Sequence, residues 1–324
     1  MIKWIILVLI VLLALLASGL IYLNRWAKFF VNAAVEREND WFMKDGARLL
    51  NPGWEDVTDS KQQERADFWL QENTWQIETP DRLRLTGAAF LQEGQRWVIA
   101  VHGYRSTGFQ DMADVAMHYY HEGYNVLVPD LRGHGRSEGK IIGMGWLDRL
   151  DLVQWIQVIC EQDPAAKIIL HGCSLGAAAV LMASGEKLPD NVKLIISDSA
   201  YTSVYSEFKW LLHKYTKYPV NRFMVLANRY ARRKMGYSLI RASVTRQLGS
   251  NHLPVLFLHD RQDPLVPVKE TTTLMEATAG EKSCVIFETT GHMQAKTQQP
   301  ADYWETVATF ISTHFPKAAK SKSN

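Results

Sequence analysis

Short apolar runs alternate with segments of helical pattern along the chain from about residue 80 onward. Most runs after the first are unbroken aliphatic stretches, which is typical of strands buried on both faces of a parallel sheet. The predicted strands are 82–91, 97–103, 124–131, 167–172, 193–200, 254–260 and 284–290. The predicted helices lie near 110–122, 145–162, 175–185, 267–279 and 301–315. This alternation predicts an α/β fold with a mostly parallel sheet and helices on both faces.

One interval in this pattern is too long for a single crossover helix. More than fifty residues separate the predicted strand that ends near Ala200 from the one that starts at Pro254, so we expect an inserted helical cap at about 201–250. This segment contains ten Lys or Arg residues and one acidic residue, Glu207. Such a basic segment favours contact with anionic lipid head groups or, equally, an ordinary solvated face.

The N-terminus carries a long apolar segment. Trp4 to Leu23 are twenty residues without a charge, which as a helix span about 30 Å, the thickness of a bilayer core. Tyr22 and Trp26 stand where interfacial aromatic residues occur, and Arg25 follows the segment. We predict a transmembrane anchor at 1–26 that contacts the bilayer through 4–23. A cleaved signal peptide is the alternative, but the segment is long for one and lacks an A-x-A cleavage site.

The side of the membrane is predicted from two opposing signals. A short basic head followed by an apolar run is the order of a signal sequence, which favours a hydrolase domain outside the cytoplasm. Three unpaired cysteines, at positions 160, 173 and 284, favour a reducing compartment instead. We predict a single-pass membrane protein with an extracytoplasmic domain.

Charge and metal-ligand spacing narrow the classes of partner. The formal net charge is +2, so we predict no nucleic-acid partner for the chain as a whole. No CxxC pair or histidine cluster stands at metal-ligand spacing, and we predict neither a metal nor another cofactor.

The chemistry is indicated by "HGCSLG" (171–176), in which Ser174 lies between two glycines. The motif follows the predicted strand 167–172 and precedes an alanine-rich helix, which is the context of a nucleophile elbow. Side chains at Gly172 or Gly176 would collide with the neighbouring strand and helix. Ligands of α/β folds bind at the carboxyl ends of the strands, so Ser174 is the candidate nucleophile.

A serine nucleophile needs a base and an orienting acid, in the chain order Ser, acid, His. His292 follows the last predicted strand and is the candidate base. Asp263, in the turn after the strand 254–260, is the first candidate for the acid, and Asp260 and Asp198 are the alternatives.

Acyl transfer also needs N–H donors for an oxyanion. The backbone N–H of Leu175, the residue after the nucleophile, is one candidate. The second is the backbone N–H of Tyr104, in the loop after the predicted strand 97–103.

Six pieces resemble, in order, the α/β-hydrolases of the group that includes monoacylglycerol lipases, cinnamoyl esterases and bacterial membrane-anchored hydrolases. They are "VHGY", "PDLRGHGRSEG", "HGCSLG", "ISDSAYTS", "LHDRQDPLVP" and "TTGHMQA". The resemblance implies an α/β-hydrolase fold, a triad of Ser174, Asp263 and His292, and oxyanion positions at Tyr104 and Leu175. The family usually has glycine where this chain has Asp260.

These inferences divide the chain into an N-terminal transmembrane anchor (1–26), a helical Trp-rich arm (27–79), an α/β-hydrolase domain (80–316) with its cap, and a basic tail (317–324). The arm contains five of the eleven tryptophans, namely Trp26, Trp41, Trp54, Trp69 and Trp75 when its first flanking residue is included. We predict a membrane-anchored serine hydrolase, a carboxylesterase or lipase-like enzyme that acts on a small acyl ester or a lipid-like substrate. The alternatives are an aminopeptidase, amidase or thioesterase with the same triad, and a non-catalytic scaffold or binding protein.

Overall fold

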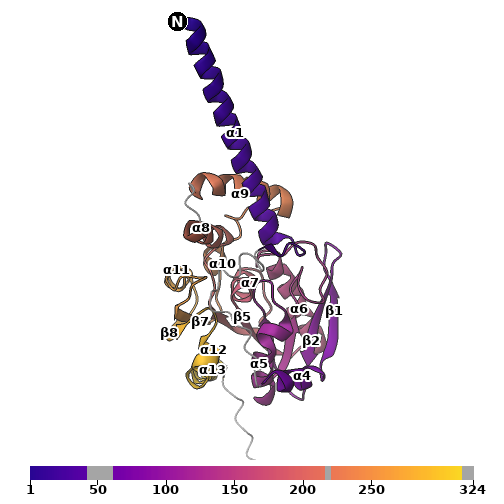
Figure 1. Cartoon of the computed structure of the whole chain (residues 1–324). Coiled ribbons are helices and arrows are strands. Elements are labelled where there is room, and N and C mark those ends of the chain that lie inside the picture. Colours follow the sequence, from indigo (N-terminus) through magenta and orange to yellow (C-terminus); the bar gives the residue numbers. More distant parts are fainter. Residues whose placement is uncertain (42–60, 216–219, 316–324) are drawn as a thin grey trace, which may run out of the picture.

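The computed structural model describes residues 1–41, 61–215 and 220–315, and within them the strands form one eight-stranded sheet with helices on both faces (Figure 1). The strand order is β1-β2-β4-β3-β5-β6-β7-β8. β1 and β2 are antiparallel, as are β2 and β4, and every other pair is parallel. The strands are β1 (Asn73–Glu78), β2 (Arg84–Phe90), β3 (Arg96–Val101), β4 (Asn125–Pro129), β5 (Lys167–Cys173), β6 (Val192–Asp198), β7 (Val255–Gln262) and β8 (Lys282–Thr290).

Both faces of the sheet are buried. Successive strand residues point to opposite sides, so the strands contribute side chains to a hydrophobic cluster on each face. In β3, for example, Val98 and Ala100 belong to one hydrophobic cluster and Ile99 and Val101 to the other. The first face is covered by α4 (Gln62–Trp69), α5 (Gly108–His121), α12 (Ala295–Gln298) and α13 (Pro300–His314). The second is covered by α6 (Asp148–Gln162), α7 (Leu175–Ala183), α10 (Val244–Leu248) and α11 (Lys269–Ala277). The mostly parallel α/β fold predicted from the sequence is confirmed.

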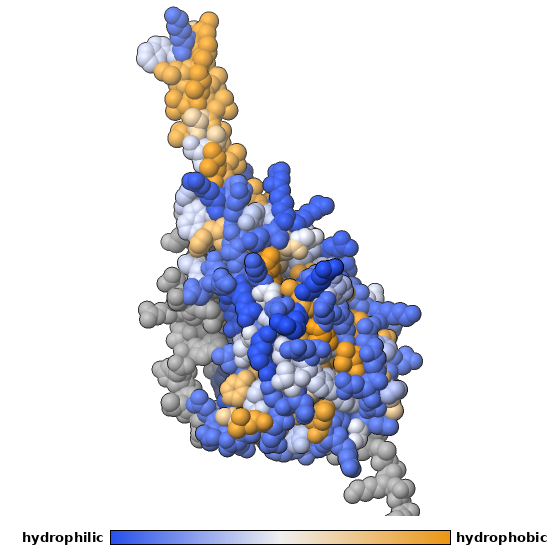
Figure 2. All heavy atoms as spheres, turned by 90° about the vertical axis from the view of Figure 1, so that its right-hand side faces the viewer, coloured by the Kyte–Doolittle hydropathy of each residue, from blue (hydrophilic) through white to orange (hydrophobic). Residues whose placement is uncertain are grey.

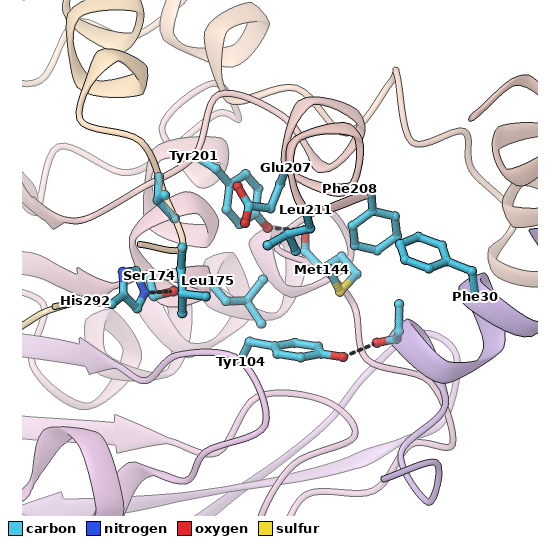
Figure 3. Close-up of a pocket in the computed structure, with 13 residues that line it drawn as sticks. Phe30, Tyr104, Met144, Ser174, Leu175, Tyr201, Glu207, Phe208, Leu211 and His292 are labelled. Carbon is cyan, nitrogen blue, oxygen red and sulfur yellow. Dashed lines mark hydrogen bonds between the residues drawn. The ribbon is translucent and has the colours of Figure 1, made fainter. Parts of the chain in front are cut away.

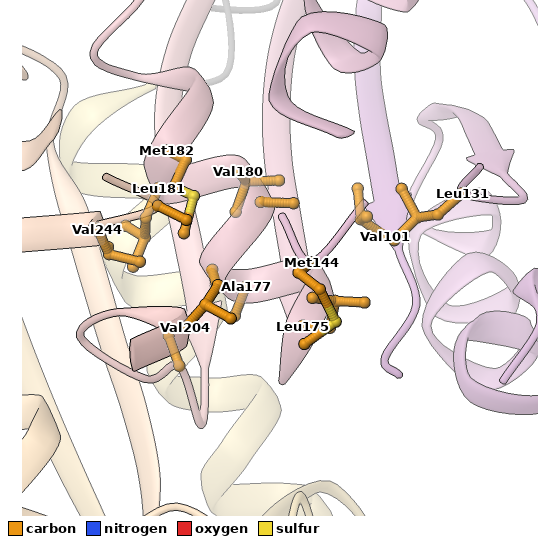
Figure 4. Close-up of a cluster of buried hydrophobic side chains, with 14 of the residues drawn as sticks. Val101, Leu131, Met144, Leu175, Ala177, Val180, Leu181, Met182, Val204 and Val244 are labelled. Atoms are coloured by element: carbon orange, nitrogen blue, oxygen red, sulfur yellow. The ribbon is translucent and has the colours of Figure 1, made fainter. Parts of the chain in front are cut away.

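Helix α7 is buried along its whole length, so its sequence shows no polar face. Its Ala177, Val180 and Leu181 pack into the cluster that also contains Val204 and Val244 (Figure 4). The small residues of "LGAAAVLMA" let α7 lie close to β5 and β6, with which it makes direct contacts. The helix that follows Ser174 is therefore held on all sides.

The interval that the sequence assigns to a cap contains α8 (Val204–Tyr215) and α9 (Val220–Met235), which lie above the sheet, and then α10. Because α10 packs against α7 and α11, it belongs to the helical layer of the hydrolase domain. Among the described residues of this interval, α8 and α9 are the helices that rise above that domain. Helix α9 lies beside the N-terminal helix α1 (Ile2–Val35). There the Tyr230 hydroxyl donates to Asn32 Oδ1 (3.0 Å) and Lys234 pairs with Glu36 (2.5 Å).

Helix α1 has two parts with different surroundings. The part before Ala27 projects away from the domain with its apolar side chains exposed (Figure 2), and it is long and apolar enough to span a membrane. From Ala27 to Val35 the helix is largely buried, and Phe30, Val31 and Val35 join the core. Burial of α1 therefore begins at Ala27.

The segment 27–79 differs from the helical arm expected from the sequence. Its first nine residues continue α1, and Asn73–Glu78 forms the edge strand β1 rather than a helix. The reason is the alternation in "NTWQIE", which turns Trp75 and Ile77 toward the core cluster. The sheet therefore begins before residue 80. Trp54 of the predicted arm and the predicted basic tail 317–324 lie outside the described residues.

The burial of Ala27–Val35 predicts that two truncations behave differently. A fragment 27–324 is expected to fold, whereas 36–324 is expected to unfold or aggregate. Each large side chain that is lost from the core removes about 1.5–3 kcal/mol, and a whole domain has only about 5–15 kcal/mol. Thermal unfolding followed by circular dichroism measures this. Within 27–324, Val31→Asp should lower the midpoint strongly, and Val225→Asp, at a side chain 64% exposed, should not. Equal midpoints for these two variants would contradict the assignment of Val31 to the core.

Candidate active site

Ser174 stands at a sharp turn between β5 and α7. Its backbone has φ +53° and ψ −115°, a conformation that costs free energy in a residue with a Cβ atom. The surrounding chain holds it there: the Ser174 N–H donates to the carbonyl of Asp198 (2.8 Å), at the end of the neighbouring strand β6. The turn leaves the hydroxyl exposed to the pocket above the sheet.

The two glycines of the motif are required by close backbone contacts. A Cβ atom on Gly176 would lie 2.1 Å from the carbonyl oxygen of Val101, at the end of β3. A Cβ atom on Gly172 would lie 2.3 Å from the carbonyl oxygen of Gly176. Backbone atoms at these distances cannot move aside without displacing a strand or a helix. The collisions predicted from the sequence are therefore with the backbone of β3 and of α7.

The structure brings Ser174, His292 and Asp263 together in one hydrogen-bonded chain. His292 Nε2 lies 2.7 Å from Ser174 Oγ, and His292 Nδ1 lies 2.6 Å from Asp263 Oδ2. The three residues follow β5, β8 and β7 respectively. The strands β5, β6, β7 and β8 are neighbours in this order and pair in parallel, so their carboxyl ends lie at one edge of the sheet. This arrangement fits a nucleophile, a base and an orienting acid.

The surroundings of His292 favour its protonated form. Burial by itself lowers the pKa of His292, but the charge and hydrogen bond of Asp263 outweigh it, so the pKa lies above the ordinary value. The second oxygen of Asp263 accepts from the N–H groups of Leu265 (2.8 Å) and Val266 (2.9 Å). These bonds fix the carboxylate, and its side chain is fully buried.

The two alternative acids have other partners. Asp260 accepts from the hydroxyl of Thr289 and from the N–H of Gln294 (2.9 Å), so it holds the loop that carries His292. Asp198 accepts from the hydroxyls of Ser199 (2.9 Å) and Tyr303 (3.1 Å). Neither makes a hydrogen bond to His292 among the residues that the structure describes, whereas Asp263 does.

The predicted oxyanion positions lie beside Ser174. Leu175 is the first residue of α7, so its N–H has no acceptor within the helix. The loop after β3 approaches the nucleophile closely, because a Cβ atom on Gly103 would lie 3.4 Å from Ser174 Cβ. Tyr104 follows this glycine, and its side chain lines the same pocket as Ser174.

Two buried histidines hold the loop after β3. Both belong to the sequence motifs "VHGY" and "PDLRGHGRSEG", but the motifs did not indicate that these side chains accept backbone hydrogen bonds. His102 Nε2 accepts from the N–H of Leu131 (3.0 Å), and His134 Nε2 accepts from the N–H of Arg105 (3.0 Å). Burial lowers the pKa of both histidines, which keeps the accepting nitrogens unprotonated. The "VHGY" and "GHG" pieces therefore position the loop that carries Tyr104.

Helix α1 is attached to the same loop, which the sequence did not indicate. The Tyr104 hydroxyl donates to the carbonyl of Ala34 (2.6 Å), near the C-terminus of α1. Arg105 donates to the carbonyls of Ala33 and Glu36 (both 2.8 Å) and, through Nε, to the Tyr104 hydroxyl (2.8 Å). A cation is favourable at the carbonyl end of a helix. Arg105 thus joins the end of α1 to the candidate oxyanion loop.

A pocket extends from the candidate triad to helix α1. Figure 3 shows Ser174 and His292 at one end and Phe30 of α1 at the other. Phe30 packs edge-on against Phe208 of α8, with ring centroids 5.3 Å apart. Most other lining residues are apolar, namely Ala34, Tyr104, Met144, Leu175, Tyr201, Leu211, Leu265 and Val266. The exception is Glu207.

Residues 1–41, 61–215 and 220–315 contain no group of three or more His, Cys, Asp or Glu side chains arranged to hold a metal ion. Cys173, next to the candidate nucleophile, is buried, and burial raises the pKa of its thiol to about 12. A thiol with so high a pKa is a poor nucleophile at neutral pH, so Ser174 remains the candidate nucleophile of this turn.

Comparison with known proteins agrees with the fold. The family model described as "Serine aminopeptidase, S33" matches residues 92–235. YqkD of Bacillus subtilis (strain 168), an uncharacterized protein, is 27% identical over 190 residues, which cover 58% of this chain and 62% of YqkD. The aligned part therefore spans about three fifths of that relative's length.

Two solved structures show similarity in fold. The esterase Pf2001 of Pyrococcus furiosus has a TM-score of 0.62 and 23% identity, and the alignment covers 75% of this chain and 92% of the esterase. The acylaminoacyl peptidase of Pyrococcus horikoshii has a TM-score of 0.55 and 16% identity, with 77% and 42% covered. These likenesses show the α/β-hydrolase fold predicted from the sequence.

The close contact at Gly176 predicts a large loss of stability in Gly176→Ala. Alanine is the better helix former by about 1 kcal/mol, but its methyl group would overlap the Val101 carbonyl, and we expect a net destabilisation of about 3 kcal/mol. Urea unfolding of fragment 27–324 measures this difference. Gly249→Ala is the matched control, because its nearest contact would be an ordinary 3.4 Å. Equal stability of the two variants would show that the turn can relax.

Proposed function

We propose that this chain, an α/β-hydrolase by its fold, is a membrane-anchored serine hydrolase that cleaves carboxylic esters through an acyl-enzyme. The observation that carries the proposal is the hydrogen-bonded chain from Ser174 Oγ through His292 to Asp263. Two comparisons support hydrolase chemistry of this type, namely the match to the serine aminopeptidase family model and the similarity in fold to an esterase and a peptidase.

The geometry supports a two-step reaction. His292 Nε2 takes the proton of Ser174 as Oγ attacks the ester carbonyl, and the backbone N–H groups of Tyr104 and Leu175 stabilise the oxyanion. His292 then gives this proton to the leaving alcohol, and the acyl group remains on Ser174. Water, deprotonated by His292, attacks the acyl-enzyme, and the acid leaves as Ser174 regains its proton. Asp263 stabilises the transient imidazolium throughout.

An ester with an apolar acyl group is the substrate class that the pocket favours. Its walls are mostly aromatic and aliphatic side chains from α1, α8 and the loop after β7, and such surfaces bind acyl chains by burial of apolar area. The esterase similarity points the same way. An aminopeptidase or amidase is the second candidate, because the matching family model is described as a serine aminopeptidase.

Membrane anchoring is proposed from the exposed part of α1. Apart from Leu23, the large apolar side chains between Ile2 and Trp26 are 45% or more exposed, and a helix with so much apolar surface is stable in a bilayer rather than in water. Tyr22, Trp26 and Arg25 lie where the helix approaches the domain, at the position of an interface. The same helix lines the pocket with Phe30 and Ala34, so the pocket would lie close to the bilayer surface.

A fluorophosphonate probe tests the proposed nucleophile. We expect the full chain in vesicles to be labelled at Ser174, because the probe reacts only with a serine that an adjacent base activates. Peptide mass spectrometry locates the label, and fragment 27–324 provides the comparison without the anchor segment. Ser174→Ala and His292→Ala should each abolish labelling and leave the fold intact by circular dichroism. A folded full chain that is not labelled in vesicles would favour the non-catalytic scaffold.

The raised pKa of His292 predicts the pH dependence of ester hydrolysis. Only neutral His292 accepts a proton, so the rate should fall as the pH falls through this raised pKa. Asp263→Asn removes the carboxylate that raises the pKa. The acid limb should then move to lower pH while the rate falls by about 10⁴-fold. The pH profile of kcat/KM measures both effects.

Asp260→Asn is the matched control for this profile. Asp260 does not bond to His292, so this variant should keep the position of the acid limb even if it turns over more slowly. A shift of the limb in Asp260→Asn and none in Asp263→Asn would reverse the assignment of the acid.

A further inference from the structure

Glu207 brings a carboxyl group into the apolar pocket of the candidate triad. It lies on the first turn of α8, and Figure 3 shows it beside Tyr201 and Leu211, above Ser174 and Leu175. It lies close enough to His292 that its ionised form raises the pKa of that histidine. A carboxyl at this position would face a substrate whose ester lies at Ser174.

One oxygen of this carboxyl lacks a hydrogen-bond partner among the residues that the structure describes. Glu207 Oε2 is buried and makes no hydrogen bond within the described part of the chain. Buried polar atoms are rarely left unpaired, because they lose hydrogen bonds to water without replacement. Glu270, in contrast, directs its Oε2 to the N–H (3.0 Å) and the hydroxyl (2.5 Å) of Thr202. Glu270 is therefore explained by the fold, and Glu207 is not.

The protonation of Glu207 indicates the kind of group that would pair with it. Burial raises the pKa of Glu207 to about 8; the charge of His292 acts against this shift, and the charges of Glu270 and Asp263 add to it. At neutral pH the carboxyl is therefore mostly protonated, and a carboxylic acid both donates and accepts a hydrogen bond. A hydroxyl group has the same two capacities, and its burial requires no desolvation of a charge.

We propose that Glu207 is a specificity-determining residue that hydrogen-bonds to a hydroxyl group of the substrate, near the scissile bond. The inference rests on the proposed ester hydrolysis at Ser174. It narrows the substrate class to esters of polyols or of hydroxy acids, whose hydroxyl would satisfy Glu207 Oε2 while the apolar remainder contacts the other walls. An alkyl ester would leave this oxygen unpaired.

A panel of esters of similar size tests the proposal on the full chain in vesicles. Propyl butyrate is the reference, glyceryl monobutyrate carries hydroxyls on the alcohol, and propyl 3-hydroxybutyrate carries one on the acyl group. We expect kcat/KM for at least one hydroxylated ester to exceed the reference by about tenfold or more, the effect of one good hydrogen bond. No preference for either hydroxylated ester would overturn the proposal.

Two variants of Glu207 separate its role from that of the pocket shape. Glu207→Leu should reduce the preference for the hydroxylated ester to near unity, because it has no polar atom there. Glu207→Gln, which still donates and accepts, should keep most of it. A preference that survives in Glu207→Leu would overturn the role of this residue. Glu276→Gln, at an exposed side chain of α11, is the control, and its preference should equal that of the natural chain.

An ammonium group is the competing partner, and 2-(dimethylamino)ethyl butyrate tests it. If this ester is favoured over propyl butyrate and Glu207→Gln loses that preference, Glu207 acts as a charge and the hydroxyl proposal is wrong. Fluorophosphonate labelling of each variant distinguishes failure of the proposed function from failure of the inference. Labelled protein without a preference for hydroxylated esters contradicts only the inference. Absence of labelling and of all ester hydrolysis contradicts the proposed function itself.

Discussion

The backbone of Ser174 is the constraint on which the site depends. Its positive φ can persist only because three strands hold the turn: β5 leads into it, the end of β6 accepts its N–H, and the end of β3 touches Gly176. The same contacts set the distance from the sheet to α7, whose small residues permit the close approach. The contacts that hold the candidate nucleophile are therefore also the contacts that pack α7 against the sheet. A change that relieves the strain at the turn would also separate α7 from the strands beneath it.

The loop after β3 extends this constraint to the N-terminal helix. Gly103 approaches Ser174, and Tyr104 and Arg105 then bind the carbonyl groups at the end of α1. The helix proposed to enter a bilayer at its N-terminal part thus contributes, at its C-terminal end, both a pocket wall and the anchorage of a candidate oxyanion donor. Displacement of α1 would move Phe30 and Tyr104 together. The proposed membrane segment and the proposed chemistry are mechanically connected through these residues, rather than joined by a free linker.

The sequence predicted those features whose causes are local. The β5–Ser174–α7 turn could be recognised because its steric requirements fall on adjacent residues, and the order of Asp263 and His292 follows from strands that end nearby. The contribution of α1 could not be predicted, since Arg105 reaches carbonyls about seventy positions away and no periodicity encodes that contact. Strand β1 was missed for a related reason. Its short alternation is stabilised by pairing with β2, and a pattern search in a tryptophan-rich region favours helix until that partner is known.

Several carboxyl groups lie near His292, but its imidazole makes a hydrogen bond to one of them, Asp263. Asp263 touches it, whereas Asp260 and Asp198 are occupied by hydroxyl and N–H donors, and Asp198 acts on it through its charge alone. Because the contacting carboxylate is fixed by two backbone N–H groups, the proton on Nδ1 has one acceptor and Nε2 is left facing Ser174. Glu207 is the acid of this group whose buried oxygen lacks a donor among the described residues. The same rule that explains the others, that a buried carboxyl needs a partner, therefore assigns its partner to the substrate side of the pocket.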